Sequence, residues 1–535
     1  MSERWTAKDL SLDAAVGQLV CPTLFGAQLG DRPYHAEAVA LELERYGWGG
    51  YILFHAGQAQ TRERLAALRA ASRLPLLVAA DMEHGAGQQI EGLSAFAPAM
   101  AFGAAGAPEL AYRLGAWTAR EALSVGVNWV LAPVADVTVD PLNPIIGIRS
   151  FGGDPARVAE MVAAFVRGCQ DQGALACAKH FPGHGDTGTD SHTRLAAVMA
   201  PRARLEAVEW PPFRAAIASG VASIMSAHLA LPGLGIDGPA TLSRAAMTGL
   251  LREELGFTGL IVSDALLMGG ITTLATPAEA AVQAVLAGCD VLLMPPDPCA
   301  AHAALVSAVE DGTLGEARVY EAAERVLSAK RRLAVPGAPA PRGAARDLSL
   351  RVAREALTLA KGEQGAPLAK GTLCVGVDDG ADPSRLSAWR RALDAHGLAR
   401  HTIVSRDTTP SQWEALIQEA ESAPGVLVGV FSPIRVSKDR SLLTEDLVSP
   451  LRAIAGRAST TVVSFSSPFL VAQLPEAQRW VLAYGAEPEQ IEAAIDALGR
   501  GLPLPGTLPV TLPLEVPTPA ARAFDERPPS GPAFA

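Results

Sequence analysis

Cysteine is scarce in this chain and acidic residues outnumber basic ones, and both properties exclude classes of function. Only six cysteines occur among 535 residues, and their spacing matches no metal-binding or redox motif. The formal net charge of -11 argues against nucleic acid and against an anionic membrane surface as partners. Four cysteines in apolar runs are expected to be buried thiols in a reducing, cytoplasmic compartment; these are Cys21, Cys177, Cys289 and Cys374.

Long apolar segments and nucleotide-binding glycine motifs are also missing. No uncharged apolar run is long enough to span a bilayer, and residues Met1–Asp9 lack the apolar core of a signal peptide. No G-x-G-x-x-G follows the first expected strand, and no G-K-[ST] follows Gly183, Gly185 and Gly188. Neither a dinucleotide-binding fold nor a P-loop is therefore expected. The length predicts two or three domains, and we expect no cofactor.

Residues 1–333 alternate short apolar runs with longer amphipathic stretches. This alternation predicts parallel strands joined by crossover helices. Eight such units in roughly 300 residues fit a (β/α)8 barrel, which takes about 250 residues or more; a doubly wound open sheet fits eight strands less well. The expected strands are Gly17–Pro22, Gly50–Phe54, Leu76–Ala80, Asn128–Ala132, Leu175–Lys179, Ser223–Ser226, Leu260–Ser263 and Asp290–Met294. The expected helices include Thr61–Ala71, Leu110–Ser124, Pro155–Cys169, Thr241–Glu254 and Pro277–Ala287.

A Pro/Gly/Ala-rich stretch within residues 334–347 predicts a linker to a second domain at 348–535. Strands and helices alternate again there, which predicts a smaller three-layer α/β sandwich domain. A helix over Leu348–Ala360 should lead into it, and the Pro-rich tail after Gly506 should be irregular. The expected strands are Leu373–Val377, Thr402–Val404, Gly425–Val430, Thr460–Ser464 and Trp480–Tyr484. The expected helices are Pro383–His396, Ser411–Glu421, Thr444–Ala455 and Pro488–Leu498.

The segment Lys179–His192, which follows the fifth expected strand, holds three histidines, two aspartates and three glycines. So many titratable groups on one loop are costly to fold unless they serve chemistry. Polar residues also follow four other strands, and the carboxyl ends of barrel strands are where active sites lie. These residues are found at 81–85, 148–152, 226–228 and 263–266. The sequence therefore predicts one polar site at this face of the barrel.

Asp264 is the strongest single candidate for a catalytic residue. It ends an apolar strand and precedes Leu266-Leu267-Met268, and a carboxylate in such surroundings needs partners or a chemical role. It would act as a nucleophile or general base. The alternative is a carboxylate that caps the following helix.

Asp190 and His192 are predicted to form a general acid/base pair. Side chains two residues apart in an extended segment point the same way, so the carboxylate would accept the imidazole N–H and raise the pKa of the ring. The alternative is a solvated loop histidine.

Four further residues are candidates for holding a hydroxyl-rich or anionic ligand. Lys179, His180 and Arg149 supply donors, and Asp81 supplies a carboxylate acceptor. A surface ion pair is the alternative for Arg149, and a helix cap is the alternative for Asp81. His180, His184 and His192 also suggest a metal site, but they lack the H-x-H and H-E-x-x-H spacings of familiar hydrolytic sites, so we expect no metal.

Lys179–His192 resembles the K-H-F-P-G-H-G-D-T-x-x-D-S-H signature of β-N-acetylglucosaminidases in glycoside hydrolase family 3, and every fixed position matches. Segments 81–83, 132–137, 148–152, 224–228 and 262–268 resemble the family as well, and residues 501–510 are similar to the end of its second domain. The resemblance covers the barrel well and the second domain only loosely.

The resemblance implies retaining hydrolysis of terminal β-linked N-acetylglucosamine from muropeptide or chito-oligosaccharide fragments, in peptidoglycan recycling. Asp264 would be the nucleophile and His192 the general acid/base oriented by Asp190. Asp81, Arg149, Lys179 and His180 would hold the sugar, with His228 nearby. The ordinary pKa of an imidazole, about 6.5, already suits proton transfer at neutral pH.

One segment departs from the family pattern. Many relatives read D-Q-E-G-G-R-V-x-R where this chain reads D-M-E-H-G-A-G-Q-Q at residues 81–89, so both arginines are absent. Recognition of an acidic leaving group is therefore expected to differ.

Three alternatives to a retaining β-N-acetylglucosaminidase stay open. A phosphorylase on the same site, acting on a β-N-acetylglucosaminide or β-glucoside, is one, because a deprotonated histidine carries no negative charge to repel phosphate. A non-catalytic protein that binds cell-wall sugars is another, and a metal-dependent hydrolase is the third. A small carbohydrate is the expected partner in the first two cases. The oligomeric state is left open between monomer and dimer.

Overall fold

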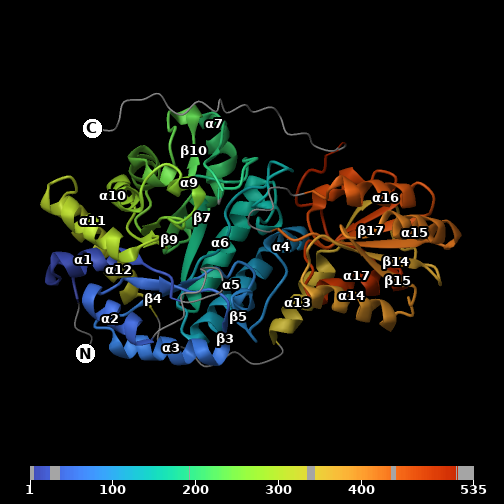
Figure 1. The fold of residues 1–535 in the computed structure, drawn as a ribbon, viewed down its shortest axis with the longest axis horizontal. Helices are drawn as coiled ribbons and strands as arrows, with labels where there is room; N and C mark the ends of the chain where they lie inside the picture. Colours follow the sequence, from blue (N-terminus) through green and yellow to red (C-terminus); the bar gives the residue numbers. More distant parts are fainter. Residues whose placement is uncertain are drawn as a thin grey trace.

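A barrel and an open sheet make up the part of the chain that the computed structural model describes, which is residues 5–24, 36–191, 193–333, 344–434, 442–513 and 515. The barrel holds the blue, green and yellow elements of Figure 1, and the second domain holds the orange and red ones. The predicted fold class, a (β/α)8 barrel followed by a smaller three-layer α/β domain, is confirmed.

Eight parallel strands form the barrel wall. Six of them pair in the order β11-β9-β7-β6-β4-β2, and β1 pairs with β12. Parallel bridges Thr23–Ile52 and Val262–Val291 join the two sets and close the ring. The strands are β1 (Val20–Cys21), β2 (Gly50–Ile52), β4 (Leu77–Ala80), β6 (Trp129–Val130), β7 (Leu175–Phe181), β9 (Ser223–Ser226), β11 (Leu260–Val262) and β12 (Leu292–Leu293).

Each of the eight predicted strands overlaps an observed one, but the first observed strand begins later than expected and β7 extends two residues beyond the prediction. Residues 17 and 18 belong to helix α1 (Leu12–Gln18) instead of the strand, because the Ser11 side chain accepts a hydrogen bond from the Ala14 N–H and starts that helix. Alternate strand residues fill the barrel interior as one apolar cluster, which includes Ile52, Trp129 and Leu293. The predicted cysteines Cys21, Cys177, Cys289 and Cys374 are buried.

Helices cover the outside of the barrel. They are α1, α2 (Ala36–Tyr46), α3 (Gln58–Ala71), α5 (Pro108–Val125), α6 (Pro155–Asp171), α8 (Trp210–Ala218), the π-helical segment η8 (Ala245–Glu254), α10 (Pro277–Ala287), α11 (Pro298–Glu310) and α12 (Glu316–Arg331). Several helices of both domains start at a polar cap followed by proline, whose fixed φ suits the first helical position. The caps are Asp154, Thr276, Asp297, Asp382 and Thr409.

Short elements lie among the loops of the barrel. The helical ones are η1 (Ala7–Asp9), η3 (Ala86–Gln88), α4 (Ala99–Ala105), η4 (Gly147–Arg149), α7 (Arg202–Arg204), η5 (Leu205–Glu209), η6 (Pro232–Leu234), η7 (Ala240–Leu242) and α9 (Gly269–Thr272). The extended ones are β3 (Ala56–Gly57), β5 (Ile90–Glu91), β8 (Ala196–Ala197) and β10 (Leu229–Ala230). Within the described ranges, no helix is both long and apolar enough to cross a membrane.

The second domain is a six-stranded sheet covered by helices on both faces (Figure 1). Its order is β13-β18-β17-β16-β14-β15, and only β13 runs antiparallel to its neighbour. The strands are β13 (Thr358–Lys361), β14 (Leu373–Asp378), β15 (His401–Ser405), β16 (Val426–Phe431), β17 (Thr460–Ser464) and β18 (Arg479–Leu482). The helices are α13 (Ala344–Glu355), α14 (Pro383–Ala395), α15 (Pro410–Ser422), η9 (Pro468–Gln473), α16 (Glu445–Ala455) and α17 (Pro488–Arg500).

The start of this domain corrects one prediction. The helix expected over Leu348–Ala360 is α13, which begins at Ala344 and ends at Glu355, so residues 344–347 are helical and not part of a linker. Residues 358–361 form edge strand β13 against β18. Their side chains pack on a neighbour far away in sequence, and no local pattern reports that contact.

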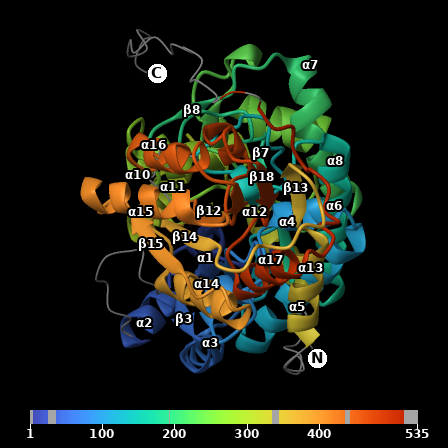
Figure 2. The same ribbon diagram turned by 90° about the vertical axis from the view of Figure 1, so that its right-hand side faces the viewer.

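The chain returns to the barrel after the second domain. The Thr507 N–H donates a hydrogen bond to the Ala104 carbonyl at 3.0 Å, and the Gly153 N–H donates to the Pro509 carbonyl at 2.8 Å. Val510 is buried in the barrel's apolar core. Helix α13 also packs on α4 and α5 of the barrel. In Figure 2 the second domain lies in front of the barrel, against the face reached by the strands' loops.

Candidate active site

A cavity of about 840 Å³ lies between the barrel and the second domain. The barrel contributes side chains that follow the carboxyl ends of its strands, as expected for this fold. They include Asp81, Glu83, Arg149, Lys179, His180 and Asp264. The second domain contributes Asp382, Arg385, Ser432, Ser466 and Glu487 among others. Five of the eight predicted site residues therefore line one cavity.

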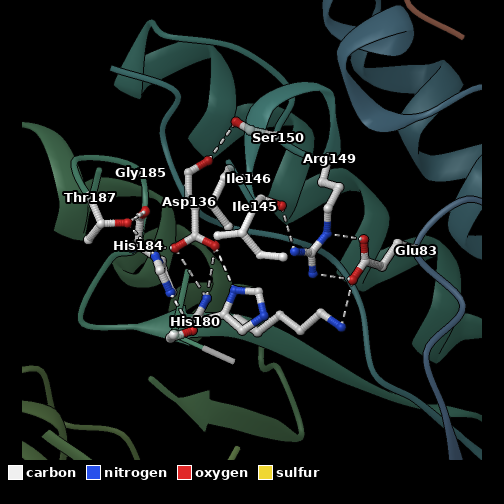
Figure 3. A network of polar contacts seen from close by, with 12 residues as sticks. Glu83, Asp136, Ile145, Ile146, Arg149, Ser150, His180, His184, Gly185 and Thr187 are labelled. Carbon is white, nitrogen blue, oxygen red and sulfur yellow. Dashed lines mark hydrogen bonds and ion pairs between the residues drawn. The ribbon is translucent and has the colours of Figure 1, made fainter. Parts of the chain in front are cut away.

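A compact ion cluster forms one wall of this cavity. The Arg149 guanidinium binds both carboxylate oxygens of Glu83, through Nε to Oε2 at 2.9 Å and Nη2 to Oε1 at 2.8 Å (Figure 3). Lys179 Nζ donates to Asp81 Oδ1 at 2.6 Å and lies 2.8 Å from Glu83 Oε1. Arg149 Nη1 also donates to the Ile145 carbonyl at 2.8 Å. Each charged group is thereby held in a fixed direction at the cavity wall.

Burial and charge oppose each other in this cluster. Burial alone would raise the pKa of Glu83, but the charges of Arg149 and Lys179 hold it well below its usual range. Burial likewise favours neutral Lys179, yet Asp81 and Glu83 outweigh burial and raise the pKa of the amine. Glu83 and Lys179 therefore stay ionised at neutral pH, and they present a charged acceptor and a charged donor to a polar ligand.

His180 is oriented by a buried carboxylate. Its Nδ1 lies 2.7 Å from Asp136 Oδ2, and Asp136 Oδ1 also accepts the backbone N–H of His184 at 2.7 Å (Figure 3). A carboxylate accepts from Nδ1–H, so a ligand meets the ring at Nε2. The Ser150 hydroxyl donates to the Asp136 carbonyl at 2.6 Å, which joins two distant parts of the β6–α6 loop that carries both Asp136 and Arg149.

Asp264 lies just beyond β11, where it lines the cavity and is partly exposed. Its backbone N–H donates to Ser226 Oγ at 3.4 Å, and its Oδ1 accepts the N–H of Ala265 at 2.8 Å. The Asp264 side chain is not buried in the apolar core, and it does not cap a long helix. A partly exposed carboxylate that lines this cavity is placed to meet a ligand.

His228 lies behind Asp264 and does not line the cavity. Its Nδ1 is 2.8 Å from Thr241 Oγ1, and its Nε2 is 3.0 Å from the Ala265 carbonyl oxygen, so Nε2 carries a proton and donates it. These contacts support the backbone next to Asp264. The prediction that His228 lies by the sugar is not supported by this position, because both ring nitrogens point into the protein.

The predicted acid/base pair falls partly outside the described residues. His192 is outside them, whereas Asp190 and Ser191 on its amino-terminal side are buried. The Asp190 carbonyl accepts both the N–H and the hydroxyl of Thr193, at 3.1 and 2.9 Å. Ser191 Oγ is 2.8 Å from His184 Nε2. These contacts lie within the loop, and the Gly270 N–H from the segment after β11 also donates to the Ser191 carbonyl at 3.1 Å.

Glu83 and Asp136 were not predicted as site residues, although both follow strand ends. Glu83 stands two residues after Asp81, a spacing that puts side chains on the same side in extended chain. Asp136 is a carboxylate inside the apolar run 132–137. Gln88 Oε1 accepts the N–H of Glu83 at 2.7 Å, so this glutamine braces the loop. No cluster of three or more potential metal ligands occurs among the described residues.

Two relatives and one solved structure that are similar to this chain all have names of enzymes that act on β-linked sugars. The chain is 28% identical over 547 residues to a β-N-acetylglucosaminidase/β-glucosidase of Cellulomonas fimi, covering 95% of each chain. A β-hexosaminidase A of Pseudoalteromonas piscicida is 36% identical over 278 residues, 47% of this chain and 46% of that one. Among solved structures, a glycoside hydrolase family 3 β-N-acetylglucosaminidase from Paenibacillus sp. str. FPU-7 matches with a TM-score of 0.84 and 32% identity, over 95% of this chain and 100% of that chain.

A family model described as the glycosyl hydrolase family 3 N-terminal domain matches residues 11–329, which is the whole barrel. That match includes every barrel side chain named above as lining the cavity. The chain therefore belongs to glycoside hydrolase family 3.

Proposed function

We propose that this protein is a retaining β-N-acetylglucosaminidase that removes terminal β-linked N-acetylglucosamine. The observation that carries the proposal is the position of Asp264, which lines the same cavity as the cluster of Asp81, Glu83, Arg149 and Lys179. That cluster offers paired donors and acceptors of the kind that hold sugar hydroxyls. The names of the Cellulomonas fimi and Paenibacillus relatives support the choice of sugar.

The proposed mechanism has two steps at the anomeric carbon. Asp264 attacks this carbon and forms a glycosyl-aspartate ester, while His192 gives a proton to the departing glycosidic oxygen. His192, now neutral, then takes a proton from water, and the resulting attack on the ester releases the sugar and regenerates Asp264. Asp190 acts as the positioning residue for His192. A histidine suits this role because its ordinary pKa lies near neutral pH.

The test compares Asp264→Ala and His192→Ala with the wild-type enzyme on a 4-nitrophenyl β-N-acetylglucosaminide and on an alkyl β-N-acetylglucosaminide. Loss of Asp264 should abolish turnover of both. Loss of His192 should harm the alkyl glycoside far more, because a nitrophenolate leaves with little proton donation. Near-normal turnover by Asp264→Ala would show that the nucleophile is assigned wrongly.

Product analysis separates hydrolysis from the alternatives. Release of free N-acetylglucosamine in phosphate buffer supports the proposal, whereas release of sugar 1-phosphate would show phosphorolysis. Sugar binding without turnover of any β-glycoside would show a binding protein. We further propose a cytoplasmic role on cell-wall or chitin fragments, which the buried thiols support.

A further inference from the structure

We propose that the second domain forms the subsite for the leaving sugar, and that its Arg385–Glu487 pair selects a neutral, hydroxyl-rich leaving group such as that of a chito-oligosaccharide. This inference rests on the proposed function. It assigns to the second domain the recognition of the part of the substrate that departs.

The strands of the second sheet deliver this subsite together. Residues just beyond the carboxyl ends of β14, β16, β17 and β18 all line the cavity that contains Asp264. In open parallel sheets, ligands bind at this edge. The lining residues from these four ends include Ala381, Ser432, Ser466 and Ala486. Two sheets therefore present their carboxyl edges to one cavity, and the barrel edge already holds the proposed nucleophile.

The Arg385–Glu487 pair is built into the cavity wall. Arg385 Nη1 lies 2.5 Å from Glu487 Oε2, and Arg385 Nη2 donates to Glu487 Oε1 at 2.6 Å. The side chains are 26% and 12% exposed, so they are partly removed from water yet reachable from the cavity. Such a two-point pair presents both donors and acceptors, which is what pairs of sugar hydroxyls require.

Glu487 is not used to cap its own helix. It precedes α17 at the N-cap position, but its side chain accepts no capping hydrogen bond. The equivalent carboxylate before α14, Asp382, does accept one, from the Ser384 N–H at 2.7 Å. Glutamate is not among the residues that commonly cap a helix, and the Glu487 side chain pairs with Arg385 at the cavity.

The charge of the lining disfavours an anionic leaving group. Among the described residues, the carboxylates that line the cavity are Asp81, Glu83, Asp264, Asp382 and Glu487, and the basic groups are Arg149, Lys179 and Arg385. Each of these three basic groups already contacts a carboxylate. Among these described residues negative groups outnumber positive ones, so we expect a carboxylate on the leaving sugar, as in a muramic acid, to be repelled. The segment after Asp81 adds no basic arginine or lysine either, since residues 84–89 read H-G-A-G-Q-Q.

The experiment measures kcat/KM for wild type, Glu487→Gln and Arg385→Met on three substrates that share the N-acetylglucosaminyl group. They are the 4-nitrophenyl glycoside, N,N'-diacetylchitobiose, and the β-1,4-linked disaccharide of N-acetylglucosamine and N-acetylmuramic acid. Arg400→Met and Glu419→Gln serve as matched controls. They break an ion pair of the same domain at 2.8 Å whose side chains are 43% and 46% exposed and do not line the cavity.

We expect wild type to prefer chitobiose over the muramic disaccharide. Both cavity variants should lose about tenfold more kcat/KM on chitobiose than on the aryl glycoside, because the nitrophenyl group offers no hydroxyl to the pair and only chitobiose loses a hydrogen bond to a charged group. Glu487→Gln, which removes a negative charge, should also gain on the muramic disaccharide. The control variants should behave like wild type on all three.

Equal losses on all three substrates would overturn the inference, since they would show a purely structural pair. A wild-type preference for the muramic disaccharide would overturn it as well. The aryl glycoside identifies a failure of the proposed function, because an enzyme that cleaves no β-N-acetylglucosaminide fails at that substrate. Normal cleavage of the aryl glycoside with unchanged selectivity in Glu487→Gln would leave the proposed function intact and reject the inference.

Discussion

His184 is a titratable residue of the loop that also carries the proposed acid/base pair, and burial keeps its ring neutral. Burial lowers the pKa of His184 to about 4, although the charge of Asp136 acts in the opposite direction. Its Nδ1 lies 2.8 Å from Thr187 Oγ1 and its Nε2 lies 2.8 Å from Ser191 Oγ. The neutral ring thus fixes two points of the loop, one of them next to His192.

Because the pKa of His184 is depressed in the folded state, its contribution to stability is complete above about pH 6.5 and is lost as the pH falls toward about 4. Between pH 7 and 4.5 we expect the wild-type free energy of unfolding to fall by about 2 kcal/mol more than that of His184→Gln. Denaturant unfolding at both pH values measures this. Parallel decreases in the two proteins would contradict it.

Gly185 and Gly188 make a matched pair on the same loop. A Cβ on Gly185 would lie 1.7 Å from the Val137 carbonyl oxygen, whereas one on Gly188 would meet only Asp140 Oδ2 at 3.8 Å. We expect Gly185→Ala to push the loop off the barrel, to cost about 1–3 kcal/mol of stability and to lower kcat/KM. Gly188→Ala should resemble wild type in thermal melting and turnover. Equal behaviour of the two variants would refute the close packing.

Single residues could be predicted where a strand end delivers them. Asp81, Arg149 and Asp264 follow strands, Lys179 and His180 lie near the carboxyl end of β7, and all five line the cavity. Glu83 and Asp136 were not predicted, because their roles depend on partners from other parts of the chain. Glu83 contacts Arg149, and Asp136 contacts His180. His228 follows a strand as well, yet its ring turns into the protein. Position after a strand therefore predicts the face of the barrel and not the direction of the side chain.

At the scale of elements, a buried carboxylate joins the last two strands of the barrel. Asp290 Oδ2 accepts the Ile261 N–H at 3.0 Å and Arg252 Nη2 at 2.7 Å, while Oδ1 accepts from Arg318 and Arg325, both at 3.0 Å. Asp290 precedes β12, at the end of the barrel opposite the cavity. Residues at that face serve stability and not catalysis.

We expect Asp290→Asn to lower the free energy of unfolding by about 3 kcal/mol, because it leaves three partly buried arginines without their buried carboxylate. KM should stay unchanged. The control is Glu321→Gln, which removes a 52% exposed partner of the same Arg318 and Arg325 and should cost less than about 1 kcal/mol. Calorimetry and steady-state kinetics check both. A changed KM in a still folded Asp290→Asn enzyme would contradict the assignment.

Helices and strands could be predicted where the hydrophobic periodicity and the helix-capping residues indicate the same element. The eight barrel strands and the cap-proline helix starts are local features, and the structure contains them. The edge strand β13 was missed because Thr358–Lys361 continues the apolar character of α13 and gains its conformation from β18. Hydrogen bonding across more than a hundred residues has no local signature.

At the scale of the whole molecule, residues 507–510, which follow the second domain, connect that domain to the barrel. A chain that ends at Gly506 loses the hydrogen bonds of Thr507 and Pro509 to the barrel and the burial of Val510. We expect the free energy of unfolding to fall by about 2–4 kcal/mol. KM should rise, because Gly153, which contacts Pro509, lies four residues after Arg149.

Thermal melting and kinetics on an aryl β-N-acetylglucosaminide measure these effects. A chain that ends at Glu515 is the control, since it keeps every contact named for this segment. If the shorter chain matches that control in both assays, the returning segment contributes nothing to the Arg149 loop.

Two sheets that face each other across one cavity divide the work of the enzyme between separately built parts. Under the proposed division of roles, substitutions in the loops of the second domain would alter which leaving group is accepted without disturbing Asp264 or the ions around the retained sugar. New specificities can therefore arise by changing one body while the chemistry is inherited from the other.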